Sequence, residues 1–249
     1  MHFDSYPKRI ISAVPSQTEL LYHLGLDEET IGITRFCIHP KSWYQSKKRI
    51  GGTKDLHIEE IKSLQPDLVI ANKEENTQEQ IEAIRKFCPV WTSDISNLEE
   101  ALAMIREIGR ITNKSDQGNQ LADKIAASFK AIPIKSKPPS AAYLIWKDPY
   151  MTIGGDTFIH DMMRYCGLEN LFRNEKRYPI ISLEDLKARS PQIILLSSEP
   201  YPFKEKHIDE LAQELPNTKI ILVNGEMFSW YGSRLLESAT YFREIRVQF

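Results

Sequence analysis

Two stretches of the chain resemble each other: IEEIKSLQPDLVIANKE at residues 58–74 and LEDLKARSPQIILLSSE at residues 183–199. The second begins 125 positions after the first, about half of the 249-residue chain, and the two align without a gap. Self-similarity at a fixed distance is the usual sequence signature of a duplicated architecture. We therefore predict that the chain is built from two similar halves.

Each copy predicts a helix, then a proline, then a buried strand. In the first copy apolar residues recur at helical spacing from Ile58 to Leu64. Pro66 then ends the helix, because proline lacks a backbone N–H and restricts the residue before it. The apolar runs at 68–71 and 193–196 are typical of parallel strands covered by helices on both faces. The expected fold class is therefore α/β, with two lobes that have parallel-sheet cores and ligand-binding loops after the strands.

Composition and charge are those of an ordinary globular protein. The chain is 41% hydrophobic with a net charge of −2, which gives no electrostatic reason to expect a nucleic acid partner. No segment approaches the roughly 18 apolar residues of a membrane span, so we expect no membrane insertion. Three cysteines without CxxC spacing indicate neither a disulfide framework nor a zinc site. The six histidines lack HxxxH or HExxH spacing, and neither GxSxG nor a P-loop occurs, so we expect no metal site and no catalytic residues.

The first nine residues contain no apolar core of a secretory signal. The expected location is therefore the cytoplasm if the chain is complete as given. It is the periplasm or a lipid-anchored position if a signal segment has been removed.

The order of predicted elements suggests where the halves meet. Helical periodicity without a strand extends from Leu98 to about Ala131, and three prolines follow it. We predict an N-terminal α/β lobe at 1–112, a connecting helix at 113–137 and a C-terminal α/β lobe at 138–249. At the first predicted helix, Ser16 and Glu19 have the spacing of a capping box.

Four stretches, one of them inside the first copy of the repeat, carry a family resemblance. They are RIISAVPSQTELLYHLGL at 9–26, PDLVIA at 66–71, GGDTFIHDMMRYCGLENL at 154–171 and YGSRLLE at 231–237. In their order and spacing these stretches resemble the cobalamin- and ferric-siderophore-binding proteins of bacterial ABC importers, most of all the cobalamin-binding type. The resemblance covers nearly the whole chain.

The resemblance implies a fold and a function. It implies two α/β lobes joined by one long helix, and a corrinoid, ferric siderophore or haem held between the lobes, with no enzymatic activity and no required cofactor. It also implies docking to an ABC permease through an acidic residue on each lobe. In this sequence the matching first-lobe position is Gln78, beside Glu79.

Candidate ligand-binding residues come from the loops that are expected to follow the strands. Aromatic rings there suit an extended apolar or conjugated ligand, and guanidinium groups suit its carboxylates or amide carbonyls. The candidates are Pro15, Ser16, Arg35, Phe36, Thr53, Lys73, Glu74, Asn76, Trp146, Met151, Glu199, Tyr201, Phe228, Trp230, Tyr231 and Arg234.

Each candidate also has a purely structural interpretation. Trp146 and the aromatics of 228–231 are otherwise core residues, and Arg35, Arg234 and the 73–76 run are otherwise solvated. Trp230→Ala separates the two interpretations, because a cleft residue costs affinity and a core residue costs stability. Two alternative functions also remain: a cytosolic enzyme that processes a corrinoid or tetrapyrrole, and a chaperone or sensor for a ligand or metal.

Overall fold

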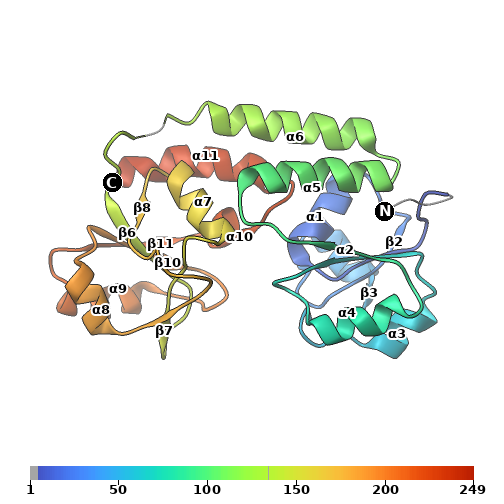
Figure 1. Ribbon diagram of the computed structural model, residues 1–249, viewed down its shortest axis with the longest axis horizontal. Helices are drawn as coiled ribbons and strands as arrows, with labels where there is room; N and C mark the ends of the chain where they lie inside the picture. Colours follow the sequence, from blue (N-terminus) through green and yellow to red (C-terminus); the bar gives the residue numbers. More distant parts are fainter. Residues whose placement is uncertain (1–4, 134) are drawn as a thin grey trace. The chain divides into compact units, whose positions relative to one another are not determined.

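The computed structural model describes residues 5–133 and 135–249, and it divides into two compact units. The first unit comprises the described residues up to Ile95, together with Glu99–Lys124 and Tyr231–Arg234. The second comprises Ser96–Leu98, Ile125–Trp230 and Leu235–Phe249. Each unit has its own sheet (Figure 1), as the duplicated sequence predicts.

The first unit contains a five-stranded parallel sheet in the order β3-β2-β1-β4-β5. Its strands are β1 (Ile10–Ser12), β2 (Thr30–Ile33), β3 (Lys48–Arg49), β4 (Leu68–Asn72) and β5 (Val90–Ser93). Its helices are α1 (Pro15–His23), α2 (Lys41–Ser46), α3 (Ile58–Ser63), α4 (Gln78–Arg85) and most of α5 (Leu98–Ile111).

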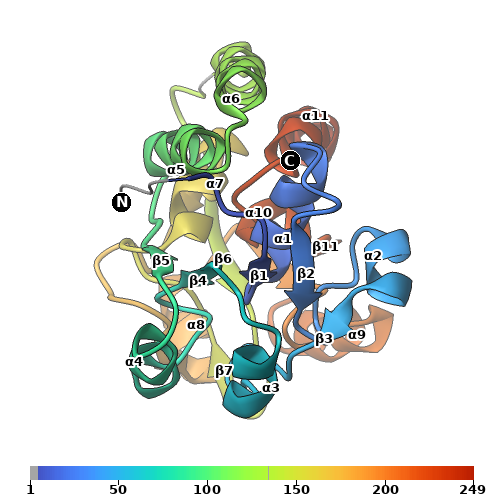
Figure 2. The ribbon, with the colours of Figure 1, turned by 90° about the vertical axis from the view of Figure 1, so that its right-hand side faces the viewer.

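Helices cover both faces of this sheet (Figure 2). Ile11, Val69 and Ala71 form one core cluster with residues of α3 and α4 such as Ile61 and Ile84. The alternate strand residues face α1 and α5 on the other side, because successive side chains of a strand point in opposite directions. Burial of each such aliphatic side chain stabilises the folded state by about 1.5–3 kcal/mol.

The second unit contains a four-stranded parallel sheet in the order β11-β10-β6-β8 and a small antiparallel pair, β7-β9. Its strands are β6 (Ser140–Leu144), β7 (Tyr150–Met151), β8 (Glu169–Asn170), β9 (Ile180–Ile181), β10 (Ile193–Ser197) and β11 (Lys219–Val223). Its helices are α7 (Phe158–Tyr165), α8 (Leu183–Arg189), α9 (Glu205–Glu214), α10 (Glu226–Ser229), α11 (Leu235–Ile245) and the 3-10 helix η1 (Arg246–Gln248).

This second sheet is also covered on both faces. Leu144 and Leu196 pack with Leu186 of α8 and Leu211 of α9. The α7 and α11 helices lie on the opposite side (Figure 1). The predicted α/β fold with two parallel-sheet cores is therefore confirmed.

The sequence repeat corresponds to a structural repeat. Helix α3 with strand β4 and helix α8 with strand β10 occupy the two copies. At equivalent positions, Gln65 has φ 47° and Ser190 has φ 48°, both in the left-handed region, and each precedes a proline. The proline disfavours the right-handed helical conformation of the residue before it, so the helix ends and the chain turns toward the strand.

Two helices form in the strand-free stretch of sequence that separates β5 from β6. Helix α5 is followed by α6 (Ser115–Lys130), with Asn113 in the left-handed region (φ 60°) between them. A Cβ on Gly118 would lie 3.0 Å from the Ile105 carbonyl oxygen, so glycine permits the close approach of α6 to α5. Helix α6 begins in the first unit and ends in the second, as expected of the connecting helix. The domain boundaries at 112 and 137 stay predictions.

The predicted capping box at the first helix is wrong. Helix α1 begins at Pro15, its N-cap residue is Val14, and no side chain caps it. Proline is favourable at a first helical position, where its missing N–H would have no helical partner. Ser16 therefore lies inside the helix. Separately, among the described residues no helix is long and apolar enough to cross a membrane.

Candidate functional site

The loops that follow the strands of the first sheet are joined by Asn76. Its amide Nδ2 donates to the carbonyl oxygens of Thr53 at 2.9 Å and Ala13 at 3.2 Å, and its Oδ1 accepts from the Asn72 N–H at 2.9 Å. Asn76 is buried, with 5% of its surface exposed. In this structure Asn76, which the sequence predicts to contact a ligand, holds the loops after β1, β3 and β4 together.

Asn72 has a similar role that the sequence analysis did not assign. Its Oδ1 accepts from the N–H groups of Glu74 and Glu75 at 2.8 and 3.1 Å, and its Nδ2 donates to the Ser93 carbonyl at 3.1 Å. Asparagine side chains often form such turns with the backbone two residues further on. The sequence does contain a signal for this role: one Asn comes directly after a predicted strand, and a second Asn follows four residues later.

Arg35 and Phe36 follow β2 and are both exposed. The Arg35 guanidinium lies 5.2 Å from the Phe36 ring centroid, and 51% of Phe36 is exposed. A Cβ on Gly52 would come within 3.0 Å of the Arg35 Nη2 and 3.1 Å of the Phe36 ring. Glycine at this position therefore allows the pair to lie against the loop after β3. Both groups stay available to a ligand.

The charged run after β4 interacts with neighbouring residues. Lys73 forms an exposed ion pair with Asp94 at 2.6 Å, and Lys54 donates through Nζ to the Glu74 carbonyl. Thr53 is buried. At the start of α1, Pro15 is half-buried and Ser16 is buried. Ligand contacts by Pro15, Ser16, Thr53, Lys73, Glu74 and Asn76 stay predictions.

Glu75 is a half-buried carboxyl group beside these loops. Burial raises its pKa above the ordinary 4.5, although Lys54 and a hydrogen bond with Thr53 act in the opposite direction. Between the ordinary value and the raised value, the folded state holds more protons than the unfolded state. Stability therefore falls as the pH rises through this window and stays lower above it.

We expect Glu75→Gln to be more stable than the wild type at pH 7, because it removes the cost of a partly desolvated charge. The difference should disappear well below pH 4.5, where both side chains are neutral in both states. Urea unfolding at pH 3.5 and pH 7 measures it. Glu79→Gln, an exposed change on α4, is the control and should stay within about 0.5 kcal/mol at both pH values. A Glu75→Gln variant that is less stable at pH 7 would contradict this explanation.

In the second unit, Glu199 and Trp230 bind each other. One carboxylate oxygen of Glu199 accepts from the Trp230 indole Nε1 at 3.0 Å and from the Ser229 hydroxyl at 2.9 Å. Only 7% of Trp230 is exposed. Both residues thus have structural partners, and their predicted ligand contacts stay predictions.

Phe228 is a core residue. It has no exposed surface, and its ring centroid lies 5.1 Å from that of Tyr143 and 4.8 Å from that of Phe242. The sequence predicts an aromatic loop at 225–234, but the short helix α10 forms there and turns Phe228 inward. The predicted contact of Phe228 with a ligand is therefore wrong.

Arg234 is engaged by an acidic residue far away in the sequence. Its Nε and Nη2 donate to the two carboxylate oxygens of Glu19 at 3.0 and 2.5 Å, both within the first unit. Arg234 and Tyr231 are 8% and 7% exposed. The alternative that Arg234 is simply solvated is wrong. Its predicted ligand contact, like that of Tyr231, stays a prediction.

Trp146 is the exposed aromatic of the second unit's strand-end loops. It follows β6, has 40% of its surface exposed, and its ring centroid lies 5.6 Å from that of Tyr201 in an edge-on contact. A backbone bridge to Met151 holds it in place, with the Met151 N–H 3.1 Å from the Trp146 carbonyl oxygen. Trp146, Met151 and half-buried Tyr201 therefore lie together where a ligand can reach them.

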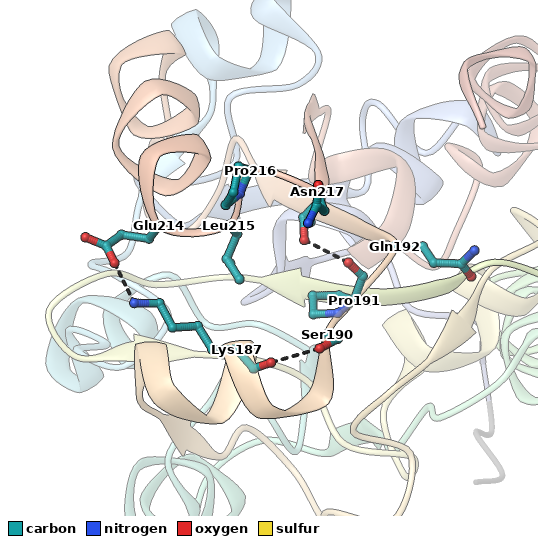
Figure 3. A pocket seen from close by; sticks show the side chains of 9 residues that line it. Lys187, Ser190, Pro191, Gln192, Glu214, Leu215, Pro216 and Asn217 are labelled. Carbon is teal, nitrogen blue, oxygen red and sulfur yellow. Dashed lines mark hydrogen bonds and ion pairs between the residues drawn. The ribbon is translucent and has the colours of Figure 1, made fainter.

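A groove also opens at the opposite, amino-terminal edge of the second sheet (Figure 3). It has a volume of about 290 Å³ and lies beside the starts of β10 and β11, where Lys187 pairs with Glu214 at 2.5 Å and the Thr218 hydroxyl donates to the Pro191 carbonyl at 2.9 Å. None of the predicted site residues lines it. Its position at the amino-terminal strand ends is not where α/β sheets usually bind ligands.

Over residues 5–133 and 135–249, no cluster of three or more His, Cys, Asp or Glu side chains could hold an ion. Cys37, Cys88 and Cys166 are free and buried. Burial raises the pKa of Cys88 and of Cys166 to about 12, so these thiols stay protonated and unreactive at neutral pH.

The chain thus has two α/β units with parallel sheets, a helix that runs from one unit into the other, and polar loops after the strands. The family described as periplasmic binding protein matches residues 10–219, and the chain belongs to this family. The expectation of a binding protein rather than an enzyme is thereby confirmed.

Relatives and solved structures agree with this assignment. A vitamin B12-binding protein of Pectobacterium carotovorum is 26% identical over 242 residues, which are 94% of this chain and 86% of the relative. One from Vibrio campbellii is 27% identical over 195 residues, 76% and 70% of the two chains. A crystal structure from Staphylococcus epidermidis, described as a possible iron-binding periplasmic solute-binding protein, has a TM-score of 0.81 at 24% identity and covers 98% of this chain and 100% of its own.

Proposed function

We propose that this chain is the substrate-binding component of an ABC import system and that it binds a corrinoid, with haem and ferric siderophores as the alternative ligands. The observation that carries the proposal is the exposed ring of Trp146, which rests edge-on against Tyr201 after the carboxyl end of β6. A macrocycle offers one large apolar face to such a ring.

The chemistry of the surrounding residues supports a large, partly polar ligand. A corrinoid carries amide groups around its rim, and haem carries carboxylates. Arg35, exposed after β2, would suit either acceptor, since a guanidinium donates several hydrogen bonds in a fixed geometry. A corrinoid also brings its own metal, so the protein need not supply a ligand to it.

The names of the relatives also support a corrinoid as the first choice of ligand and haem as an alternative. Those described above that cover 76% and 94% of this chain are named vitamin B12-binding proteins. Structures with the same fold include a periplasmic haem-binding protein in complex with two haems, at 21% identity and a TM-score of 0.83. The proposal includes two further points: that the protein delivers its ligand to an ABC permease, and that it does so outside the cytoplasm.

We expect the purified protein to bind cyanocobalamin, and Trp146→Ala to weaken that binding about thirtyfold, or about 2 kcal/mol, because a buried aromatic contact is lost. Quenching of intrinsic fluorescence and calorimetric titration measure the affinity. Haemin and a ferric siderophore are titrated in parallel to establish the ligand class.

Tyr44→Ala is the matched control, since Tyr44 is 42% exposed on α2 and lies outside the strand-end loops. It should leave the affinity unchanged. If the wild type binds none of the three ligands, the proposed function is wrong. If it binds one of them and Trp146→Ala binds it equally well, the ligand class stands and the placement at Trp146 is wrong.

A further inference from the structure

A buried histidine lies behind the Trp146–Tyr201 pair. His207, near the start of α9, has 2% of its surface exposed. Its Nδ1 lies 2.8 Å from the backbone N of Lys204, which can only donate. A neutral imidazole has one donor and one acceptor nitrogen. Since Nδ1 accepts here, the proton of the neutral ring must be on Nε2.

The other ring nitrogen faces the tyrosine. His207 Nε2 lies 3.3 Å from the Tyr201 hydroxyl oxygen. With its proton on Nε2, the imidazole donates and the hydroxyl oxygen accepts. The proton of Tyr201 is then left to point away from His207. The single hydroxyl proton is then directed to an acceptor other than His207, while the oxygen keeps one further lone pair.

The surroundings keep the ring neutral and the geometry fixed. Burial, with a contribution from Lys147, lowers the pKa of His207 below its ordinary value. Lys206 acts in the same direction, and Glu210 and a backbone hydrogen bond with Lys204 oppose it. The ring also contacts Phe203, with centroids 5.3 Å apart, and that residue in turn packs 4.7 Å from Tyr201. These contacts leave the Tyr201 ring few alternatives to the position beside Trp146.

We propose that His207 is a positioning residue that turns the Tyr201 hydroxyl proton away from itself, so that Tyr201 can donate to a ligand bound beside Trp146. The site then favours a ligand that combines an apolar face with a carbonyl or carboxylate oxygen at its edge. This inference rests on the proposed function, because it names how the same loops recognise the rim of the ligand.

The tautomer can be tested without any ligand. In protein with ¹⁵N-labelled histidine, the Nε2 resonance of His207 should show a directly bonded proton at pH 7, and the Nδ1 resonance should be that of an unprotonated nitrogen. His207→Asn assigns the signals. A proton on Nδ1 would overturn the inference whatever the protein binds.

The role in recognition is tested by a double-mutant cycle on affinity. Tyr201→Phe should weaken binding of cyanocobalamin about fivefold to tenfold, the usual effect of losing one hydrogen bond. His207→Asn keeps an acceptor for the Lys204 N–H but removes the donor to Tyr201, and it should weaken binding by a similar factor. The double variant should bind no more weakly than Tyr201→Phe, because His207 acts only through the hydroxyl.

Melting temperatures within a few degrees of the wild type show that the variants are folded. The positioning role would be overturned if the affinity losses of the two single variants multiplied in the double variant, or if Tyr201→Phe bound as well as the wild type. The proposed function would stand in both cases. If the wild type binds haemin or the ferric siderophore in place of cyanocobalamin, the cycle is run with that ligand. If it binds none of them, the proposed function fails and the recognition role fails with it.

Discussion

Replacing Phe228 by alanine is expected to lower the free energy of unfolding by about 3–5 kcal/mol, because a fully buried aromatic ring is removed and a cavity remains. The ring packs between Tyr143 of β6 and Phe242 of α11, so its loss loosens the contact of α11 with the sheet. In thermal unfolding the expected decrease in melting temperature is on the order of 10 °C.

Phe36→Ala is the matched control for this change. The side chain is the same, but 51% of Phe36 is exposed, so its removal should alter stability by less than about 0.5 kcal/mol. Circular dichroism during urea and thermal unfolding compares the two variants. A Phe228→Ala protein with wild-type stability and weakened ligand binding would restore Phe228 as a ligand contact.

Removing the guanidinium of Arg234 is expected to cost a similar amount, about 3–5 kcal/mol, because Glu19 is left as a largely desolvated charge without its main partner. The exposed fractions of the two side chains are 9% and 18%, so water replaces little of the lost interaction. Arg234→Ala is measured by urea unfolding, together with Glu19→Ala and the double variant.

The double variant should be more stable than the sum of the two single losses implies, because removing both charges leaves neither unpaired. Arg85→Ala is the control, since Arg85 pairs with Glu82 at 2.6 Å on the exposed side of α4, and pairs of that kind contribute about 0–1 kcal/mol. Additive losses at Glu19 and Arg234 would show that the pair does not act as a unit.

The sequence was sufficient for the features that local pattern determines. The repeat at 58–74 and 183–199 predicts both helix–turn–strand segments, and the prolines predict where their helices end. Apolar runs give the strands, because a buried parallel strand must be apolar on both faces. The connecting helix follows from the long stretch of helical periodicity without a strand.

The features that the sequence could not give depend on contacts between distant residues. Glu19 and Arg234 are 215 positions apart, and nothing in either segment identifies the other. The dense aromatics at 228–231 resemble a ligand loop, yet the four-residue helix α10 turns Phe228 into the core. Periodicity cannot detect so short a helix. The roles of Asn72 and Asn76 likewise depend on which loops the sheet order brings together.

The membership of Tyr231–Arg234 in the first unit affects the order in which the protein can be completed during synthesis. The ribosome makes every strand of the first sheet long before it makes Arg234, and domains usually fold as their residues emerge. Here the first unit contains residues made after nearly all of the second. The ion pair between Glu19 and Arg234 therefore cannot form until 215 residues have been added after Glu19. A nascent chain that stops before residue 231 carries an unfinished first unit, although every strand of its sheet has been made.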